Sequence, residues 1–396
     1  MINRLTTLLT LLALLSGCVT SNVNSGSVPA LKTYGGALDT EEILDIGVVV
    51  FDPGIDDTVA EEGVYPEIRR AEATFQALQL ATELDDQGVW GATRVIPSSS
   101  FGSDVIASGK ILQSDGQSLK LQVTAEDSTG VIWIDREYKD TTNSLFYKHK
   151  QRTKTDPFQK IYRDIANDLL RFFRSMTTAD RIEVRNVSKM QFAIGFAPDA
   201  YSDYIKTSDS GVTELVRLPA ESDPMLKRIN TLATRNEIFI DTLQGHYENF
   251  SNEMIMPYDE WRRLSLEEAK SLEKLQIESR RQLITGGAAL IAGIAAATSD
   301  DRDVRTAGAV GMYAGGSLIK SGLERRAEAN IHSLALEELG QSLEAEITPQ
   351  VIELEDRTIQ LSGTIEDQYG QWREILSDIY AAEIAELPTN ISQPSP

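Results

Sequence analysis

The sequence predicts an α+β protein, in which an amino-terminal α/β sandwich is followed by a long, mainly helical region. Two observations predict this class. Short apolar and β-branched runs joined by tight turns fill the chain up to about residue 140. From residue 223 onward, apolar residues recur at three- and four-residue spacing, which is the period of an α-helix. The chain of 396 residues is long enough for two or three such units.

The sandwich begins with a strand and a helix. Ile46–Phe51 is β-branched and ends at Asp52-Pro53-Gly54, which predicts a buried strand closed by a turn. Pro66 and Gly88 bound the next element, because proline favours the first turn of a helix and glycine its end. The apolar face of this helix comprises Ile68, Ala71, Phe75, Leu78 and Ala81 or Thr82.

A second strand, "VWGATRVIP", leads into a three-stranded meander over residues 104–140. Its turns are predicted at 114–116 and 128–130. In the second turn we expect Asp127 to hydrogen-bond its own turn backbone and Gly130 to adopt a positive φ. A helix over about 156–176 closes the sandwich, so the predicted order is strand, helix, strand, three-stranded meander, helix.

The meander also carries the segments "ASGKI" (107–111) and "DSTGVIWIDREY" (127–138). In these features residues 43–175 resemble the TolB amino-terminal domain family, with related domains in curli-secretion and flagellar outer-membrane lipoproteins. The resemblance implies assembly with envelope proteins or into rings. No catalytic residue is carried over with it.

The amino terminus predicts the cellular location of the protein. Met1 to Leu15 is a short basic start followed by an apolar run that is too short to span a bilayer, which is typical of a signal peptide. The run ends in "LSGC", which resembles the lipobox of bacterial lipoproteins. The resemblance implies that Cys18, the single cysteine, carries palmitate-type acyl chains as a membrane anchor. Val19 in place of aspartate implies the outer membrane, with the body facing the periplasm.

These patterns predict the organisation of the whole chain. We expect Pro257 to interrupt the helical region, and Pro198 to break a short helical pair in the segment before it. The expected units are a signal peptide (1–17), a lipidated flexible tether (18–40), the TolB-like α/β domain (41–176), an irregular connector (177–222), a helical region (223–346), a β-hairpin plus helix (347–387) and a disordered tail (388–396).

The helical region contains a glycine-rich helical hairpin over 283–322. Small residues recur every four positions and predict close helix–helix contacts, as in a glycine zipper; they are Ala289, Gly293, Ala297, Ala307, Gly311 and Gly315. The runs 283–298 and 306–319 would rise about 24 and 21 Å, short of the roughly 30 Å hydrocarbon core. The charged turn "SDDRD" also opposes a crossing. The pattern therefore favours packing within the protein or its oligomer, with membrane insertion as the alternative.

The sequence offers no catalytic, cofactor-binding or metal-ligating motif, so we expect no cofactor and no enzyme activity. His149, His246 and His332 lack ligand spacing, and no phosphate-binding glycine loop occurs. Trp261 and Trp372 are interpreted as packing anchors beside snorkelling arginines. The formal charge of −22 argues against a nucleic-acid partner.

Two functions remain. The first is an outer-membrane lipoprotein that acts as a non-catalytic envelope scaffold or assembly component, binds envelope proteins and forms a homo-oligomer. The alternative is a secretion or transport component whose glycine-rich hairpins insert in the membrane to line or gate a pore.

Overall fold

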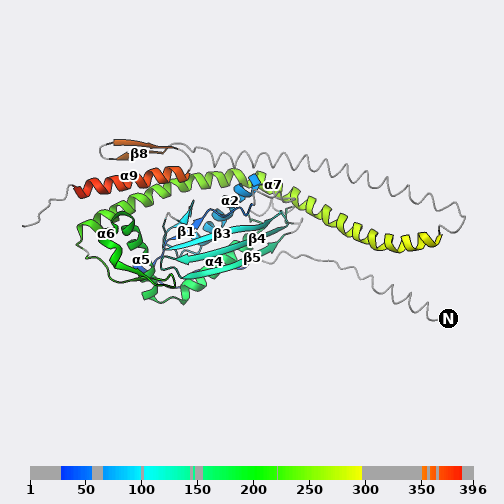
Figure 1. Ribbon diagram of the computed structural model, residues 1–396, viewed down its shortest axis with the longest axis horizontal. Coiled ribbons are helices and arrows are strands. Elements are labelled where there is room, and N and C mark those ends of the chain that lie inside the picture. Colours follow the sequence, from blue (N-terminus) through cyan, green and yellow to red (C-terminus); the bar gives the residue numbers. More distant parts are fainter. Residues whose placement is uncertain are drawn as a thin grey trace, which may run out of the picture.

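The structure is a computed structural model, and it describes residues 28–55, 66–99, 102–142, 146–147, 155–220, 222–296, 350–354, 357–362 and 365–385. Within these residues the predicted α+β class is confirmed: an amino-terminal mixed sheet of five strands is combined with long helices (Figure 1).

The sheet has the strand order β2-β1-β3-β4-β5. Its central strand β1 is parallel to both β2 and β3, so that Ile46 pairs with Thr93 on one side and with Val105 on the other. The remaining strands form an antiparallel meander. The bounds are β1 Ile46–Val49, β2 Thr93–Ile96, β3 Val105–Ser114, β4 Ser118–Asp127 and β5 Ile132–Thr141.

Two helices, α2 (Pro66–Asp85) and α4 (Gln159–Ser175), pack on the sheet and on each other. Alternation along β4 explains which face they cover. Leu119, Leu121 and Val123 are fully buried, whereas the residues between them carry polar side chains and are partly exposed. The result is a two-layer arrangement with one apolar and one polar sheet face.

Residues 177–222 are not the irregular connector that the sequence predicts. Thr177 and Asp180 form a reciprocal capping box that begins α5 (Thr178–Phe196), a helix of 19 residues. Pro198 then begins a new short helix, because proline suits a first helical turn. The elements that follow are α6 (Pro198–Tyr201), the 3-10 turn η4 (Ser202–Tyr204) and the hairpin of β6 (Ile205–Thr207) and β7 (Thr213–Leu215).

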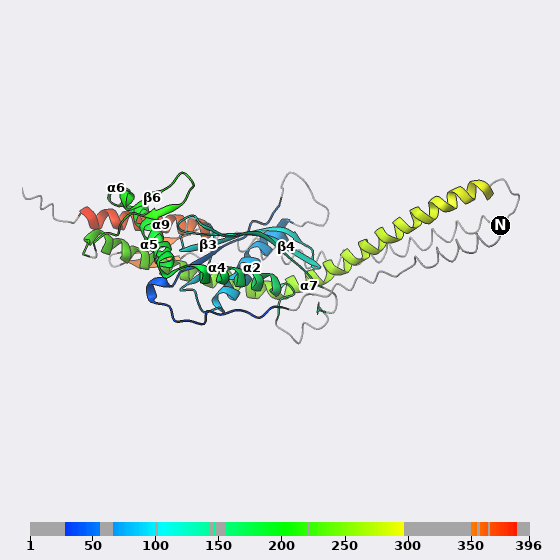
Figure 2. The same ribbon diagram turned by 90° about the horizontal axis from the view of Figure 1, so that it is seen from below.

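The helix α7 (Pro224–Ala296) is continuous over 73 residues, so the predicted interruption at Pro257 is wrong. Proline removes one hydrogen bond from a helix and bends it. Here packing outweighs this cost, because Met254, Tyr258 and Trp261 on α7 form a buried cluster with α2. Figures 1 and 2 show α7 crossing the body and then extending away from it.

The carboxy-terminal unit consists of the hairpin β8 (Gln350–Leu354) and β9 (Arg357–Leu361), followed by α9 (Ile365–Ala385). α9 packs against α7, where the rings of Phe239 and Trp372 stack with centroids 5.3 Å apart. Trp261 and Trp372 are both buried, which confirms them as packing anchors. One hydrophobic core runs from the sheet through α5 and α7 to α9.

The predicted flexible tether is partly wrong as well. Residues 28–39, which we call the N-terminal strap, lie against α4, where Asn167 accepts the main-chain N–H of Lys32 and donates to the carbonyl of Ala30. Leu31, Tyr34 and Leu38 pack on the core. The apolar side chains of the N-terminal strap and the amide of Asn167 together hold this segment on the body. Its small and polar composition had predicted a flexible chain. Residues 18–27 lie outside the described part of the chain.

Candidate functional site

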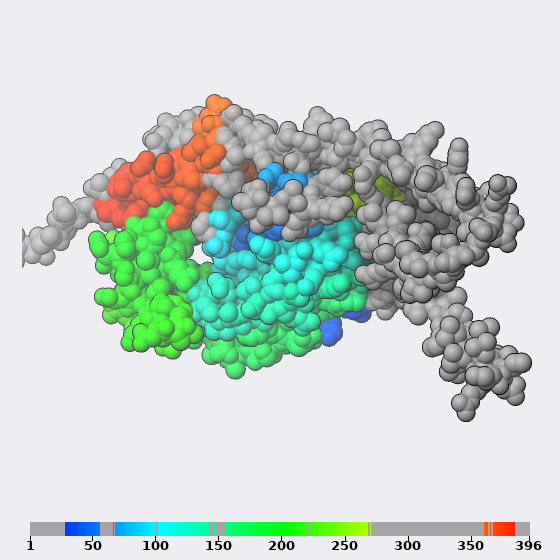
Figure 3. Space-filling view, turned by 45° about the vertical axis from the view of Figure 1, so that its right-hand side comes forward, coloured from blue at the N-terminus to red at the C-terminus, as the bar shows by residue number. Residues whose placement is uncertain are grey.

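A cavity of about 540 Å³ lies beside the ends of the sheet at which β1 and β3 begin. Its walls come from the sheet, from α5 and α7 and from α9. Figure 3 shows the hollow between the green surface that contains α5, the red α9 and the cyan strands. The charged residues that line it are Asp45, Arg94, Asp104, Glu126, Asp127, Arg185, Lys189, Glu237 and Arg373.

One buried acid of this cavity is Asp104, immediately before β3. Its Oδ2 accepts the main-chain N–H of Asp45 at 2.9 Å and lies 3.6 Å from an Nη of Arg185 on α5. Burial, supported by the nearby Asp45 carboxylate, raises the pKa of Asp104 to about 6, although the main-chain N–H of Asp45 and Arg185 act in the opposite direction. The carboxyl group of Asp104 therefore gains or loses its proton at about pH 6.

The β4–β5 turn forms another side of the cavity, and here the predicted local structure is confirmed. Gly130 has φ +83°, and Asp127 Oδ1 accepts the main-chain N–H of Thr129 at 2.9 Å. Asp127 Oδ2 also accepts the indole N–H of Trp133 at 2.7 Å. Both carboxylate oxygens of Asp127 therefore accept hydrogen bonds that stabilise the turn, as in an Asx turn.

The arginines on β2 and α9 that line the cavity also have partners. Arg94 on β2 contacts Asp241 on α7 at 2.6 Å, and the guanidinium of Arg373 lies over the ring of Phe196 at 4.7 Å. One buried acceptor, Asn236 Oδ1, has no hydrogen-bond partner within the described residues. The cavity is therefore polar, with five acidic and four basic side chains along its walls. Such a site can hold a polar group. The carboxylates of Asp45, Asp104 and Asp127 accept main-chain N–H groups, and Asp104 also lies beside Arg185.

A second polar cluster lies at the place where α7 leaves the body. Both Nη atoms of Arg262 donate to Asp156 Oδ2 at 3.0 Å, and one of them donates to Asp259 Oδ1 at 2.5 Å. The side chain of Arg262 is 1% exposed, so the prediction of a snorkelling arginine is wrong at this position. Its guanidinium also lies over the ring of Tyr258, 4.1 Å from the centroid.

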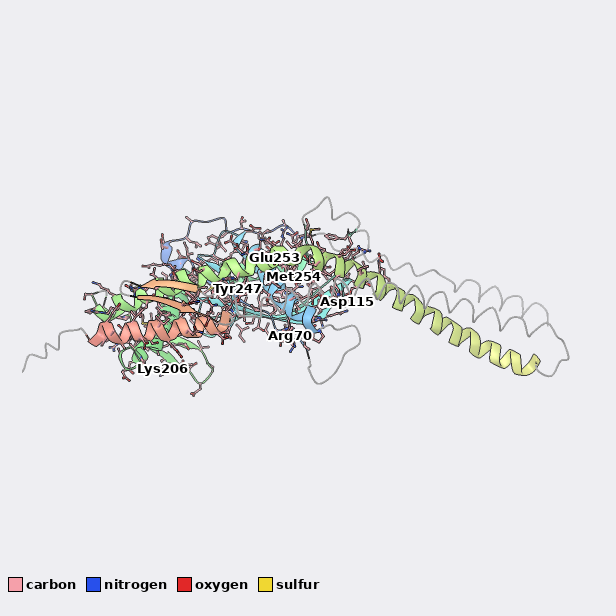
Figure 4. The ribbon with its side chains drawn as sticks, turned by 90° about the horizontal axis from the view of Figure 1, so that it is seen from above. Arg70, Asp115, Lys206, Tyr247, Glu253 and Met254 are labelled. Carbon is pink, nitrogen blue, oxygen red and sulfur yellow. The ribbon has the colours of Figure 1, made fainter. Side chains whose placement is uncertain are left out.

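Tyr258 extends this cluster into the interface with α2. Its hydroxyl donates to Glu72 Oε1 at 2.8 Å, and the hydroxyl of Ser114 donates to the same oxygen at 2.7 Å. Burial raises the pKa of Glu72, while Arg69 opposes this. The β3–β4 turn closes the cluster, because a Cβ at Gly116 would collide with the main-chain oxygen of Arg262. Figure 4 shows Met254 on the stretch of α7 over the body and Asp115, of this turn, at the end from which α7 extends.

The structure describes only some of the site residues that the sequence predicts. Ala289 and Gly293 lie on the last turns of α7, where the backbone alone is described. The other predicted site residues lie outside the described part of the chain; they are Cys18, Ala297, Ala307, Gly311 and Gly315. The same holds for His149, His332 and the rest of the hairpin. His246, on α7, is partly buried, and this burial lowers its pKa.

In the described segments no group of three or more histidine, cysteine or acidic side chains is placed to hold a metal ion. No helix in the described ranges is long and apolar enough to cross a membrane. The sequence gives no signal that Asp104, Glu72 and Arg262 belong to buried networks, because they have partners far away along the chain.

The chain matches no protein-family model and no curated protein.

Proposed function

We propose that this protein is an outer-membrane lipoprotein, anchored through acyl chains on Cys18 and facing the periplasm, that acts as a non-catalytic scaffold. It assembles with copies of itself and with envelope proteins through the end of α7. The resemblance of residues 43–175 to the TolB amino-terminal family is part of this proposal and supports an envelope role.

The observation that supports a scaffold most is the continuity of α7. One half of the helix is fixed in the core, through Leu232, Leu243 and Tyr258 and through the buried Arg262. The other half, the arm (residues 263–296), begins with the buried Leu264 and Leu266 and then extends beyond the body (Figure 2). A rigid helix that projects from a fixed base presents a long surface for association, and the arm ends in the small-residue stripe with Ala289 and Gly293.

The networks of the cavity point in the same direction. Asp45, Asp104 and Asp127 each accept main-chain hydrogen bonds and so stabilise the turns at this end of the sheet. Asp104 also pairs with Arg185 of α5 at 3.6 Å. This use of acidic residues is what a binding or structural body needs, and it supports a non-catalytic role.

The test is the native mass of the chain without signal or lipid, with Cys18→Ser, measured in solution without detergent. We expect an oligomer. Gly293→Leu and Gly311→Leu should weaken it, because overpacking at a close helix contact costs about 1–3 kcal/mol. Ala288→Leu, next to the stripe, serves as the matched control and should have much less effect.

Self-association through this stripe would be refuted if the parent chain were a monomer. It would also be refuted if all three variants had the same native mass as the parent chain. A chain that needs detergent even without lipid would favour the alternative, a pore-lining secretion or transport component. Labelling with a palmitate analogue tests the anchor separately: the wild type should incorporate it and Cys18→Ala should not.

A further inference from the structure

The beginning of the N-terminal strap and the arm of α7 lie at the same end of the body. Pro29 accepts a hydrogen bond from Arg163 near the start of α4 at 3.2 Å, and Thr33 accepts one from Arg174 near its end at 2.6 Å. The strap therefore runs parallel to α4, and the chain before Pro29 points toward the start of this helix. Asp156, just before α4, binds Arg262, where the arm begins.

Figure 2 agrees with these contacts: the dark blue strap runs along the body to the end from which α7 extends. An acyl anchor on Cys18 would therefore hold the body by the end that carries the arm. This consequence depends on the strap being packed, because a free chain up to residue 40 would leave the orientation open.

Two lengths then decide how the arm meets the membrane. The chain from Cys18 to Pro29 spans at most about 40 Å when it is fully extended. The helix from Arg262 to Ala296 rises about 50 Å. The body is thus held closer to the bilayer than the arm is long. An arm directed to the anchored side must reach the bilayer surface even at the full stretch of the tether.

The sequence at the end of the arm suits an interface. Leu283–Ala296 contains no charged residue, and a helix of this length rises about 20 Å, too little for the roughly 30 Å hydrocarbon core. Arg280 and Arg281 precede it, and Asp300 and Asp301 follow it. Charges at both ends oppose a perpendicular entry, and an apolar run of only 14 residues is typical of an interfacial segment.

We propose that the end of the arm, Leu283–Ala296, is a membrane-binding element that lies in the interface of the same bilayer that holds the Cys18 lipid. The inference rests on the proposed lipid anchor. Its partner is the lipid surface, and it makes the protein a two-point attachment, with one covalent anchor and one helical contact at the same end of the body. The body is thereby held in one orientation, with the β6–β7 hairpin turned away from the membrane.

The experiment uses the full lipidated chain in phosphatidylcholine vesicles. Acylation blocks the only native thiol, so an introduced cysteine is unique and can carry an environment-sensitive fluorophore. The test variant is Ile291→Cys in the apolar end of the arm. The control is Lys206→Cys in β6, at the far end of the body (Figure 4). Nitroxide groups near the top of the acyl chains, or at their ends, quench the fluorophore according to depth.

We expect the fluorophore at Ile291→Cys to lose several times more intensity than the one at Lys206→Cys, and to lose more with shallow nitroxides than with deep ones. The quenching should persist when only the vesicles that carry the protein contain nitroxide. It should vanish when nitroxide is present only in added, protein-free vesicles.

Stronger quenching by deep nitroxides would overturn the interfacial position in favour of a spanning segment. Quenching by the protein-free vesicles would overturn the contact with the same bilayer. Flotation with the vesicles reports the anchor independently. A protein that floats through Cys18 but shows equal quenching at both positions refutes this inference alone and leaves the scaffold intact, whereas a chain that carries no lipid refutes both the anchor and the inference.

Discussion

Arg262 on α7 donates two hydrogen bonds of 3.0 Å to the Asp156 carboxylate that precedes α4. This contact joins residues 106 positions apart and fixes the arm to the body at the place where it leaves. Removal of one partner from a buried ion pair costs about 3–5 kcal/mol, because the other charge remains buried and uncompensated. We therefore expect Arg262→Met to lower the free energy of unfolding by that amount in denaturant titrations.

The neighbouring Arg263 is the matched control, since its ion pairs with Glu260 and Glu267 are partly exposed. Arg263→Met should cost less than about 1 kcal/mol. Equal effects of the two substitutions would show that the buried pair does not fix the arm.

A glycine pair tests the contact of the β3–β4 turn with α7. Gly116 and Gly88 both have a positive φ, of +71° and +62°, so alanine is strained by about 1–2 kcal/mol at either site. Only at Gly116 would the added Cβ also collide with backbone, the main-chain oxygen of Arg262; at Gly88 nothing lies within 4 Å. Gly116→Ala should destabilise the protein by about 1–3 kcal/mol more than Gly88→Ala in thermal or denaturant unfolding. Similar losses would mean that the turn does not press on α7.

Gln244 on α7 protects an edge of the sheet. Its side-chain amide donates to the carbonyl of Val95 at 2.7 Å and accepts the N–H of Val95 at 2.9 Å, so it takes the place of a neighbouring strand on β2. Gln244→Met should cost about 1–3 kcal/mol and speed hydrogen exchange at the Val95 amide. Glu248→Met, one turn further at an exposed position, should change neither. Unchanged exchange at Val95 in Gln244→Met would show that the edge is protected in another way.

The local features of the fold could be predicted from the sequence. The strand that begins at Ile46, the helix between Pro66 and Gly88 and the Asp127–Gly130 turn depend on neighbouring residues. The structure confirms each of them, although the strand ends at Val49 instead of Phe51. The spacing of apolar residues and the residue types of a turn are local signals, so they can be recognised in one sequence.

Long-range pairing could not be predicted. The path of α7 through Pro257 depends on packing against α2, and the burial of Arg262 depends on Asp156, from another part of the chain. The strap had one available signal, the apolar Leu31 and Tyr34 within a small polar segment, but its acceptor Asn167 lies 135 residues away from Lys32. In the cavity, Asp104 meets Asp45 and Arg185 only after the sheet and α5 have come together.

The strap provides its own prediction. Asn167→Ala removes both hydrogen bonds to the main chain of Ala30 and Lys32, so the strap should separate from α4 more often. Lys32 is the only basic residue between 28 and 39, and trypsin cleavage after it reports this opening. Cleavage should become faster in Asn167→Ala and stay unchanged in Arg171→Ala, an exposed position one turn further on α4. Equal rates in the two variants would contradict a strap held by Asn167.

The pKa of Asp104 predicts how stability depends on pH. Because the folded protein raises this pKa from 3.8 to about 6, folding favours the protonated carboxyl. The contribution is fully present below the unfolded value and is lost as pH rises through about 6. A shift of this size corresponds to about 3 kcal/mol, at 1.36 kcal/mol per pKa unit.

The measurement is the free energy of unfolding from pH 4 to pH 7, for the wild type and for Asp104→Asn. Asparagine keeps an oxygen that accepts the N–H of Asp45 but does not titrate. Because part of the effect lies below pH 4, the substitution should remove about 2.4 kcal/mol of the decline between these pH values. The comparison cancels the carboxyls that both proteins share, including Glu72 and Glu237, whose raised pKa values contribute to a decline of the same sign. Parallel pH profiles for the two proteins would show that Asp104 does not titrate within the cavity, and that Arg185 fully compensates its charge.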